Sequence, residues 1–135
     1  MTSRVHKSRS AGKCLSNVST ETFELSLKQN QIEKIENIAH LKKLKELNLA
    51  NNFITKLENI DGLPALEVLN LWNNRIAEIG NIVDYEPIKY LALRGNLISD
   101  AELDKQMDHL RLLQRRKFFQ LGDEDIPDIL AGNYD

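Results

Sequence analysis

The chain has 135 residues, a formal net charge of −2 at pH 7, three histidines and a single cysteine. This length suits one domain, the near-neutral charge argues against a general nucleic-acid or membrane-surface binder, and the lone Cys14 excludes an internal disulfide. No apolar run reaches the roughly 18 residues needed to cross a membrane, and residues 1–20 contain no hydrophobic stretch typical of a secretory signal, so we expect a cytoplasmic protein.

Residues 1–20 form a basic, serine-rich segment without acidic residues. Such a segment cannot bury enough apolar surface to fold alone, so we expect a disordered N-terminal tail. This composition is also typical of a transit peptide, although the amphipathic pattern of one is lacking. Ser8 and Ser10, which lie beside basic residues, are candidate phosphorylation sites on composition alone. The basic residues of the tail are Arg4, Lys7, Arg9 and Lys13.

A 22-residue repeat follows this tail. Its clearest mark is a set of four equally spaced asparagines, each of which closes the phrase L-x-x-L-x-L-x-x-N-x-I or a near copy of it. Self-similarity at a period of about 20–50 residues predicts a solenoid or another repeat architecture. The asparagines are Asn30, Asn52, Asn74 and Asn96, and the phrases are Thr22 to Ile32, Leu44 to Ile54, Leu66 to Ile76 and Ile88 to Ile98.

The order of residue types within the phrase explains this architecture. Side chains alternate along a strand, so the leucines at positions four and six, such as Leu47 and Leu49, point inward while their neighbours point outward. A single coil cannot bury these leucines, and successive coils therefore stack with their short strands paired in parallel. The asparagine lies where the chain leaves the strand, and its amide can bond main-chain groups that the turn leaves unpaired. We therefore expect the four asparagines to form a structural ladder.

A second apolar set, I-E-N-I-x-x-L, follows the phrase at Ile35 to Leu41 and Leu57 to Leu63, and less completely at Ile79 to Tyr85. The period and this phrase resemble the leucine-rich-repeat class typified by a regulatory subunit of protein phosphatase 1 and also seen in axonemal dynein light chains. The resemblance implies a right-handed α/β solenoid with a parallel sheet on its concave side, short helical turns on its convex side, and a non-enzymatic binding role. It covers repeats at 22–43, 44–65, 66–87 and 88–109.

The 22-residue register fails in the fifth repeat, where Phe118 falls at the asparagine position. Ser99 and Glu102 instead form an S-x-x-E capping box, followed by apolar residues at helical spacing. We therefore expect a capping helix from about Asp100 to Phe118 that packs on the last coil. A degenerate fifth strand near Leu112 to Gln114 is the competing prediction.

The two ends of the predicted domain, residues 21–121, are less well defined by the sequence. At the first coil, Glu21 to Leu27 is expected to form a marginal edge strand. After the domain, residues 122–135 form an acidic tail without a basic residue. This tail either packs back on the cap or presents a linear motif to a partner. Deletion of residues 123–135 would lower stability in the first case and abolish only partner capture in the second.

The outward strand positions form the expected binding surface, because curvature gathers them on the concave side. A framework position would be leucine or isoleucine, so the outward placement of the chain's only tryptophan, Trp72, indicates partner binding, with Phe53 and Tyr90 flanking it. Aromatic and arginine side chains dominate binding energy at interfaces, and Arg75 and Arg94 are expected to receive an acidic group of the partner. The alternative is that Trp72 stacks on Arg94 or Phe53 within the chain, or is covered by the acidic tail. The candidate partner-binding residues are Phe53, Val68, Asn70, Trp72, Arg75, Tyr90, Arg94 and Leu97.

These features favour a non-enzymatic protein–protein interaction module or adaptor that is monomeric outside its complex. A phosphatase-regulatory role and an axonemal or cytoskeletal dynein-associated role are narrower alternatives that the resemblance implies, with the cilium, cytoskeleton or nucleus as locations. No catalytic, cofactor or metal site is expected, because His6, His40 and His109 lack metal-ligand spacing and no phosphate-binding loop is present. Nucleic-acid binding through the basic residues from Arg4 to Lys13 and from Arg115 to Lys117 is a less favoured alternative, which a steep salt dependence would reveal.

Overall fold

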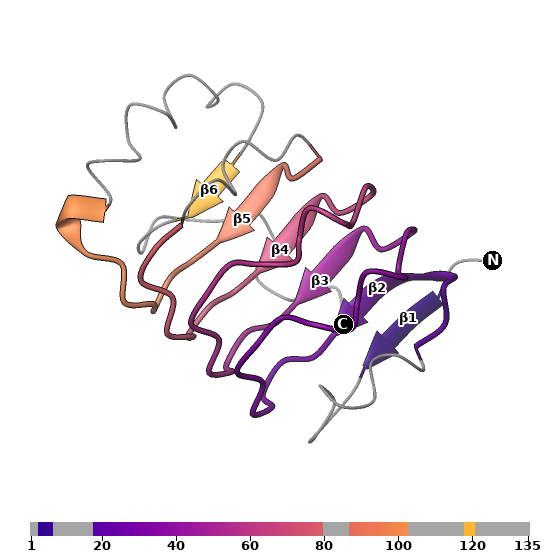
Figure 1. Ribbon diagram of the computed structural model, residues 1–135, viewed down its shortest axis with the longest axis horizontal. Helices are drawn as coiled ribbons and strands as arrows, with labels where there is room; N and C mark the ends of the chain where they lie inside the picture. The colour runs from indigo at the N-terminus through magenta and orange to yellow at the C-terminus, as the bar shows by residue number, and fades with distance from the viewer. Residues whose placement is uncertain (1–2, 7–17, 80–86, 103–117, 121–135) are drawn as a thin grey trace.

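The computed structural model describes residues 3–6, 18–79, 87–102 and 118–120, and these residues form one parallel sheet with its connecting turns (Figure 1). The six strands follow one another in chain order, and every neighbouring pair is parallel. Parallel neighbours in chain order require a crossover after every strand, so the chain winds as a stack of coils. This confirms the predicted solenoid. The strands are β1 (Ser3–His6), β2 (Thr22–Ser26), β3 (Glu46–Asn48), β4 (Val68–Asn70), β5 (Tyr90–Ala92) and β6 (Phe118–Gln120).

The register of β2 to β5 reproduces the 22-residue period, so equivalent residues of successive coils lie side by side. The inward leucines at positions four and six form two columns along the stack, and each of them is 2% exposed or less. Burying a leucine side chain contributes about 1.5–3 kcal/mol, so these columns are the main source of stability. The columns are Leu25, Leu47, Leu69 and Leu91, and Leu27, Leu49, Leu71 and Leu93.

The return path of each coil consists of tight turns. Leu41 donates its backbone N–H to the carbonyl of Ile38 at 2.9 Å, and Leu44 donates to Leu41 at 3.1 Å. The next coil repeats this pair of bonds at Leu63 and Leu66, with donor–acceptor distances of 3.0 and 3.1 Å. The expected short helical turns are therefore present in these two coils as isolated i→i+3 turns of the 3₁₀ type, without a longer run of helix.

The side chain of Asn52 joins two coils through the main chain. Its Nδ2 donates to the carbonyl oxygens of Leu49 and Ala50 in its own coil, at 3.0 and 3.2 Å, and to that of Leu27 in the preceding coil at 3.0 Å. Its Oδ1 accepts from the backbone N–H of Ile32 at 3.0 Å. The equivalent bonds of the other coils are Asn74 with Leu49, Leu71, Trp72 and Ile54, Asn96 with Leu71, Leu93 and Ile76, and Asn30 with Leu27 and Lys28.

A second series of positions at the same spacing has left-handed backbone. Asn51 and Asn73 precede the ladder asparagines with φ of 60° and 56°, and Gly95 occupies the equivalent position with φ of 78°. Asn37 and Asn59, the asparagines of the I-E-N-I phrase, both have φ of 62°. Asparagine and glycine adopt this conformation most readily, which explains their recurrence at these turns; Gln29, with φ of 59° at the first position of the series, is the exception. The repetition of the phrase is visible in the sequence, whereas the left-handed backbone that requires the asparagine is visible only in the structure.

The N-terminal end of the sheet departs from the expectation of disorder for residues 1–20. β1 lies parallel to β2, and its register places Val5 beside Leu25. Consequently β2, within the segment Glu21 to Leu27, has a neighbour on each side and is not the edge strand that we expected. Val18 is 5% exposed and belongs to the core cluster. Residues 7–17 lie outside the described residues.

At the C-terminal end the structure describes the first residues of the predicted capping helix, and the expected last residue of that helix lies in a strand. Residues 100–102 are helical, and the backbone N–H of Glu102 donates to Ser99 Oγ at 3.1 Å, as a capping box requires. Phe118, the expected end of the helix, instead begins β6, which pairs with β5 so that Phe118 lies beside Tyr90. The interval from Tyr90 to Phe118 is 28 residues, six more than the period, and for this reason projection of the register did not find the strand. Residues 103–117, including the alternative strand at Leu112 to Gln114, and the acidic tail lie outside the described residues.

Glu102 couples the start of the cap to the preceding coil, because its Oε2 accepts the backbone N–H of Ile79 at 2.9 Å. Ile79 is 1% exposed, so removal of this acceptor leaves a buried donor unpaired. We expect Glu102→Ala to lower the free energy of unfolding by about 1–2 kcal/mol in urea titrations. Asp100→Ala, at an exposed site in the same helical turn, should cost no more than a few tenths of a kcal/mol. Equal losses in the two variants would contradict this role of Glu102.

Candidate functional site: the outward strand face

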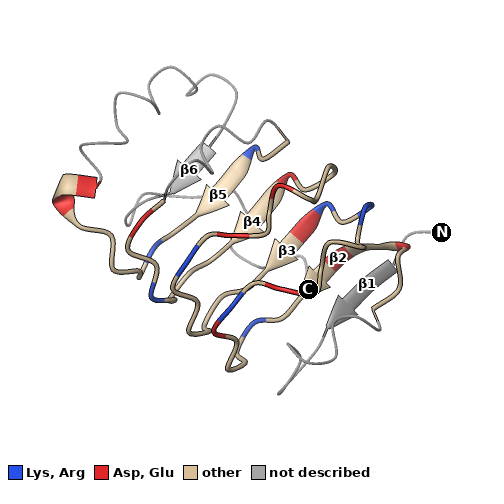
Figure 2. Cartoon of the chain, viewed as in Figure 1, with Lys and Arg blue, Asp and Glu red and all other residues tan. Residues whose placement is uncertain are grey.

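The outward face of β2 to β5 divides into a polar half and an apolar half. Glu24 and Ser26 on β2, with Glu46 and Asn48 on β3, supply the polar half, whereas β4 and β5 carry Val68, Tyr90 and Ala92 at the equivalent positions. The acidic segments of β2 and β3 are visible in Figure 2. The two halves therefore differ in chemistry although they belong to one continuous sheet.

Four side chains of the apolar half form a cluster that is separate from the leucine core. Val68 is 3% exposed and Ala92 is fully buried, and the partly buried rings of Trp72 and Tyr90 pack against them. We call these four residues the outer-face cluster. The structure thus brings together three of the candidate residues, Val68, Trp72 and Tyr90, on the side of the sheet opposite to the leucine columns.

Two arginines stack on aromatic rings of the preceding coil. The Cζ atom of Arg94 lies 4.1 Å from the centroid of the Trp72 ring, and that of Arg75 lies 4.5 Å from the centroid of the Phe53 ring. Such cation–π contacts contribute roughly 0.5–1 kcal/mol at exposed sites. A guanidinium carries five N–H donors, so an arginine in such a contact can still donate to an acceptor. The stacking of Trp72 on Arg94 is the intramolecular contact that the sequence analysis gave as an alternative to partner binding.

The remaining candidates occupy different surroundings. Phe53 stacks with Arg75, and its expected position beside Trp72 stays a prediction. Leu97 is 64% exposed and Phe53 is 39% exposed, which makes them the exposed large hydrophobic side chains of the described residues. These two residues follow their ladder asparagines directly, at the end of the coil's strand segment.

Asn70 differs most from its expected role as a partner-binding residue. It is only 2% exposed, and its Oδ1 accepts the backbone N–H of Trp72 at 3.0 Å. Asn48 makes the same bond to the backbone N–H of Ala50, also at 3.0 Å, one coil earlier. Such a bond between a side chain and the backbone two residues on fixes the direction of the chain after the strand. Asn70 therefore positions Trp72, and its 22-residue spacing from Asn48 was the signal that could have shown this.

The search for metal-ligating groups covers only the part of the chain that the structure describes. In residues 3–6, 18–79, 87–102 and 118–120, no group of three or more His, Cys, Asp or Glu side chains is arranged to hold a metal ion. His40, one of the histidines considered above, lies near the backbone instead, with Nε2 3.0 Å from the carbonyl oxygen of Val18. Over the same residues, the structure contains no helix of the length and apolar character that a membrane span requires.

Comparison with known proteins agrees with this architecture. A family model described as Leucine Rich repeats (2 copies) matches residues 24–64. No protein among the curated sequences matches the chain. Three solved structures are similar. An internalin C2 from Listeria monocytogenes has 24% identity over 76% of this chain and 42% of its own, with a TM-score of 0.58, and an internalin (inlF) from the same species has 21% identity over 85% of this chain and 39% of its own, with a TM-score of 0.57. A leucine-rich-repeat protein from Leptospira interrogans has 27% identity over 75% of this chain and 31% of its own, with a TM-score of 0.55.

These similarities support a leucine-rich-repeat protein with the solenoid fold of its class. The chain spans less than half the length of each of the three solved chains. Leucine-rich repeats are in general protein–protein interaction modules, whereas the partner of each is set by the side chains on its surface.

Proposed function

We propose that this protein is a non-enzymatic adaptor that binds a protein partner on the concave face of the solenoid, with Trp72 as the central contact. The observation that carries the proposal is the outer-face cluster, in which the chain's only tryptophan packs outside the leucine core. Tryptophan, tyrosine and arginine are the residue types most enriched among positions that dominate binding energy. The cluster and its adjoining arginine combine all three.

The pairing of Arg94 with Trp72 supports an acidic group on the partner. The stacked guanidinium has little rotational freedom, so a hydrogen bond to a carboxylate costs less ordering than it would for a free arginine. Arg75, which stacks on Phe53 in the same way, offers a second donor one coil before Arg94. A partner segment with an apolar side chain beside a carboxylate would fit this combination.

The test is a crosslinking pulldown from native cells, with the full chain as bait. Truncation of a central contact costs about 2 kcal/mol or more, so Trp72→Ala should reduce capture of the partner roughly thirty-fold. Arg94→Glu should also abolish capture, because it places a like charge against the acidic group. Lys56→Glu, a charge reversal at an exposed position outside this face, is the matched control.

Two results of the pulldown would end the proposal. Undiminished capture by both Trp72→Ala and Arg94→Glu would show that the partner binds elsewhere. An equal loss with Lys56→Glu would show that the interaction is a general effect of charge. Urea unfolding of each variant, compared with the wild type, separates loss of binding from loss of fold.

The identity of the captured partner decides between the narrower roles. A phosphatase catalytic subunit would favour a regulatory subunit of a protein phosphatase, and a dynein chain would favour an axonemal or cytoskeletal role. Both rest on the I-E-N-I resemblance rather than on the outer-face cluster. The same experiment tests the proposed cytoplasmic location and its alternatives, the cilium, the cytoskeleton and the nucleus.

A further inference from the structure

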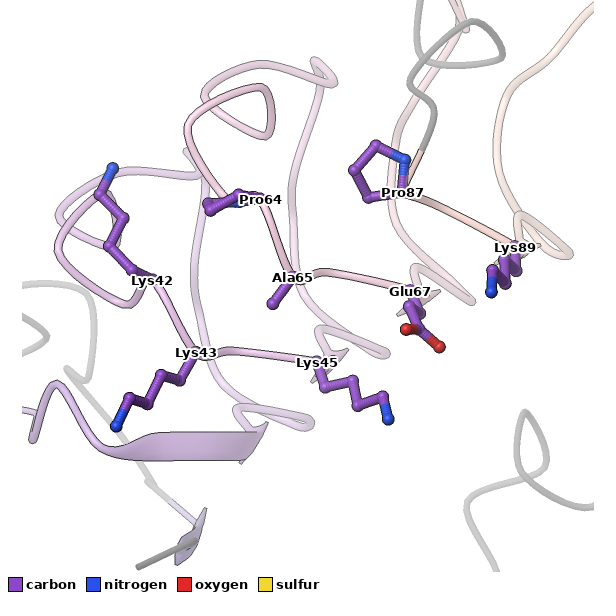
Figure 3. Close-up of a pocket in the computed structure, with 8 residues that line it drawn as sticks. All are labelled: Lys42, Lys43, Lys45, Pro64, Ala65, Glu67, Pro87 and Lys89. Atoms are coloured by element: carbon purple, nitrogen blue, oxygen red, sulfur yellow. The ribbon is translucent and has the colours of Figure 1, made fainter.

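A groove of about 650 Å³ lies at the edge of the solenoid where the strands begin (Figure 3). It is formed by the connections that lead into β3, β4 and β5, which belong to three successive coils. The sequence alone predicts no more than a solvated face for the lysines of the first connection. The residues lining this feature, which we call the lysine groove, are Lys42, Lys43, Lys45, Pro64, Ala65, Glu67, Pro87 and Lys89.

The lysine groove carries an excess of positive charge, with four lysines and one glutamate. Figure 2 shows the basic segments where the chain enters β3 and β5. The whole chain has a formal net charge of −2, so this excess is local. A concave surface lined by one sign of charge attracts ligands of the opposite sign more strongly than a flat surface does.

Two of the four lysines are engaged by the protein itself. Lys43 Nζ lies 2.6 Å from Glu21 Oε2, and this hydrogen bond and charge lower the pKa of Glu21 from its ordinary value. Lys42 Nζ donates to the carbonyl oxygen of Gly62 at 3.0 Å. In the described part of the chain, the ammonium groups of Lys45 and Lys89 make neither an ion pair nor a hydrogen bond. These two lysines are therefore available to an external anion.

Lys45 and Lys89 occupy equivalent positions two coils apart, and Glu67 lies between them on the intervening coil (Figure 3). Two strand spacings separate the lysine backbones by about 9.6 Å. In the described residues no ion pair joins Glu67 to either lysine. The charge pattern along the groove is thus plus, minus, plus.

The backbone of the groove is already paired. Glu67 donates its N–H to the carbonyl of Lys45 at 2.9 Å, and Lys89 donates to the carbonyl of Glu67 at 2.8 Å. An occupant therefore cannot add a strand here and has to be recognised by side chains. Apart from the charged groups, the surface that remains for contact is the apolar one of Pro64, Ala65 and Pro87.

We propose that the lysine groove binds an acidic peptide segment of a partner protein in polyproline II conformation. Two carboxylates of the segment pair with Lys45 and Lys89, and an uncharged residue between them lies over Glu67. A polyproline II helix has three residues per turn and rises about 3.1 Å per residue, so carboxylates three residues apart lie on one face, about 9.3 Å apart, and match the separation of the lysines. Aliphatic side chains between the acids contact the proline and alanine surface.

A nucleic acid fits the lysine groove less well than an acidic peptide. Its phosphates recur at every nucleotide, so one of them would meet Glu67 and be repelled. Among the described residues no aromatic side chain lines the groove, whereas binding of single strands commonly uses base stacking on such side chains. The single glutamate thus favours a ligand whose negative charges are interrupted.

The experiment measures fluorescence anisotropy of a labelled peptide, Gly-Ser-Asp-Ala-Val-Asp-Ser-Gly, titrated with the full chain at low salt. We expect the double variant Lys45→Glu with Lys89→Glu to raise the dissociation constant about ten-fold, since two attractive contacts become repulsive. Glu67→Gln should lower the dissociation constant about two-fold or more, because it removes the acid that lies between Lys45 and Lys89. An isomeric peptide with adjacent aspartates should bind more weakly to the wild type than the original.

The matched control is the double variant Lys34→Glu with Lys56→Glu, which changes the net charge equally at two exposed lysines one coil apart. It should alter the dissociation constant by less than about two-fold. Equal weakening in both double variants, or no measurable binding to the wild type, would overturn the proposal. Tighter binding of a ten-residue oligothymidylate that is lost with Lys45→Glu and Lys89→Glu would overturn it in favour of a nucleic acid. Trp72→Ala leaves this binding unchanged, so the result is independent of the proposed function of the outer-face cluster.

Discussion

Replacement of Asn52 by alanine is expected to lower the free energy of unfolding by about 3 kcal/mol. The largest single effect is on the buried N–H of Ile32, which donates to Asn52 Oδ1 and would have no acceptor in the variant. The carbonyls of Leu27 and Leu49 also accept from Asn30 and Asn74, so each would keep one bond and lose another. A small cavity between two coils adds to the loss. Urea unfolding followed by circular dichroism measures the change.

Asn52→Asp separates hydrogen bonding from packing, because aspartate has the size of asparagine. It keeps an acceptor for Ile32 but replaces the Nδ2 donor by an oxygen that faces carbonyl oxygens. We therefore expect a loss as large as that of the alanine variant. Asn73→Gly is the control, since Asn73 is exposed, its φ of 56° suits glycine, and its side chain donates one bond, to Asn51. If Asn52→Asp were as stable as the wild type, the ladder would owe its importance to shape and not to its donors.

The sequence predicted the centre of the fold well because each structural requirement there recurs every 22 residues. Leu47 and Leu69 are interchangeable in register and burial, so a single rule about inward positions assigned both correctly. The bonds of Asn52 follow from the same repetition, since an amide at the end of each strand meets equivalent carbonyls on two coils. Each repeat therefore shows the same local structure again, and the agreement between repeats makes the prediction more reliable than a single segment would.

The ends of the sheet could not be predicted in this way, because the repeat does not extend to them. β1 contains no L-x-L pair, and only Val5 occupies the register of the inward leucines. Its strand pairs with an edge that β2 would otherwise leave open, and such pairing depends on long-range contact rather than on local composition. β6 is displaced by six residues from the period, and no local signal in the sequence fixes the length of that insertion.

The sequence predicted which side of the sheet the aromatic side chains occupy, but it did not predict which residues they contact. Alternation along the strand placed Trp72 and Tyr90 outside the core, where the structure has them. It could not show that Arg94 stacks on Trp72, because stacking depends on rotamers and on the distance between coils. Asn70 was misassigned because an outward polar residue was taken to face a partner, whereas its short side chain returns to its own backbone.

Replacement of Leu69 by alanine is expected to lower the free energy of unfolding by about 3–5 kcal/mol. Leu69 is fully buried in the centre of the inward column, with Leu47 and Leu91 beside it on the adjoining strands. Neighbouring strands are held in place by backbone pairing, so they cannot move inward to fill the space, and the cost of a cavity adds to the lost burial. Leu97→Ala, at a leucine that is 64% exposed, should change the value by less than about 0.5 kcal/mol.

The position of Leu69 also affects how the chain unfolds. In a solenoid each coil contacts only its neighbours, so stability is a sum of coil and interface contributions. A weakened central coil reduces the coupling between the coils on either side, and we expect a smaller denaturant dependence for Leu69→Ala, as unfolding loses cooperativity. Unfolding followed separately by Trp72 fluorescence and by circular dichroism should then give two different midpoints. Coincident midpoints with an unchanged denaturant dependence would mean that the stack unfolds as one unit even with this cavity. The end coils would then contribute more to cooperativity than contacts between neighbouring coils imply.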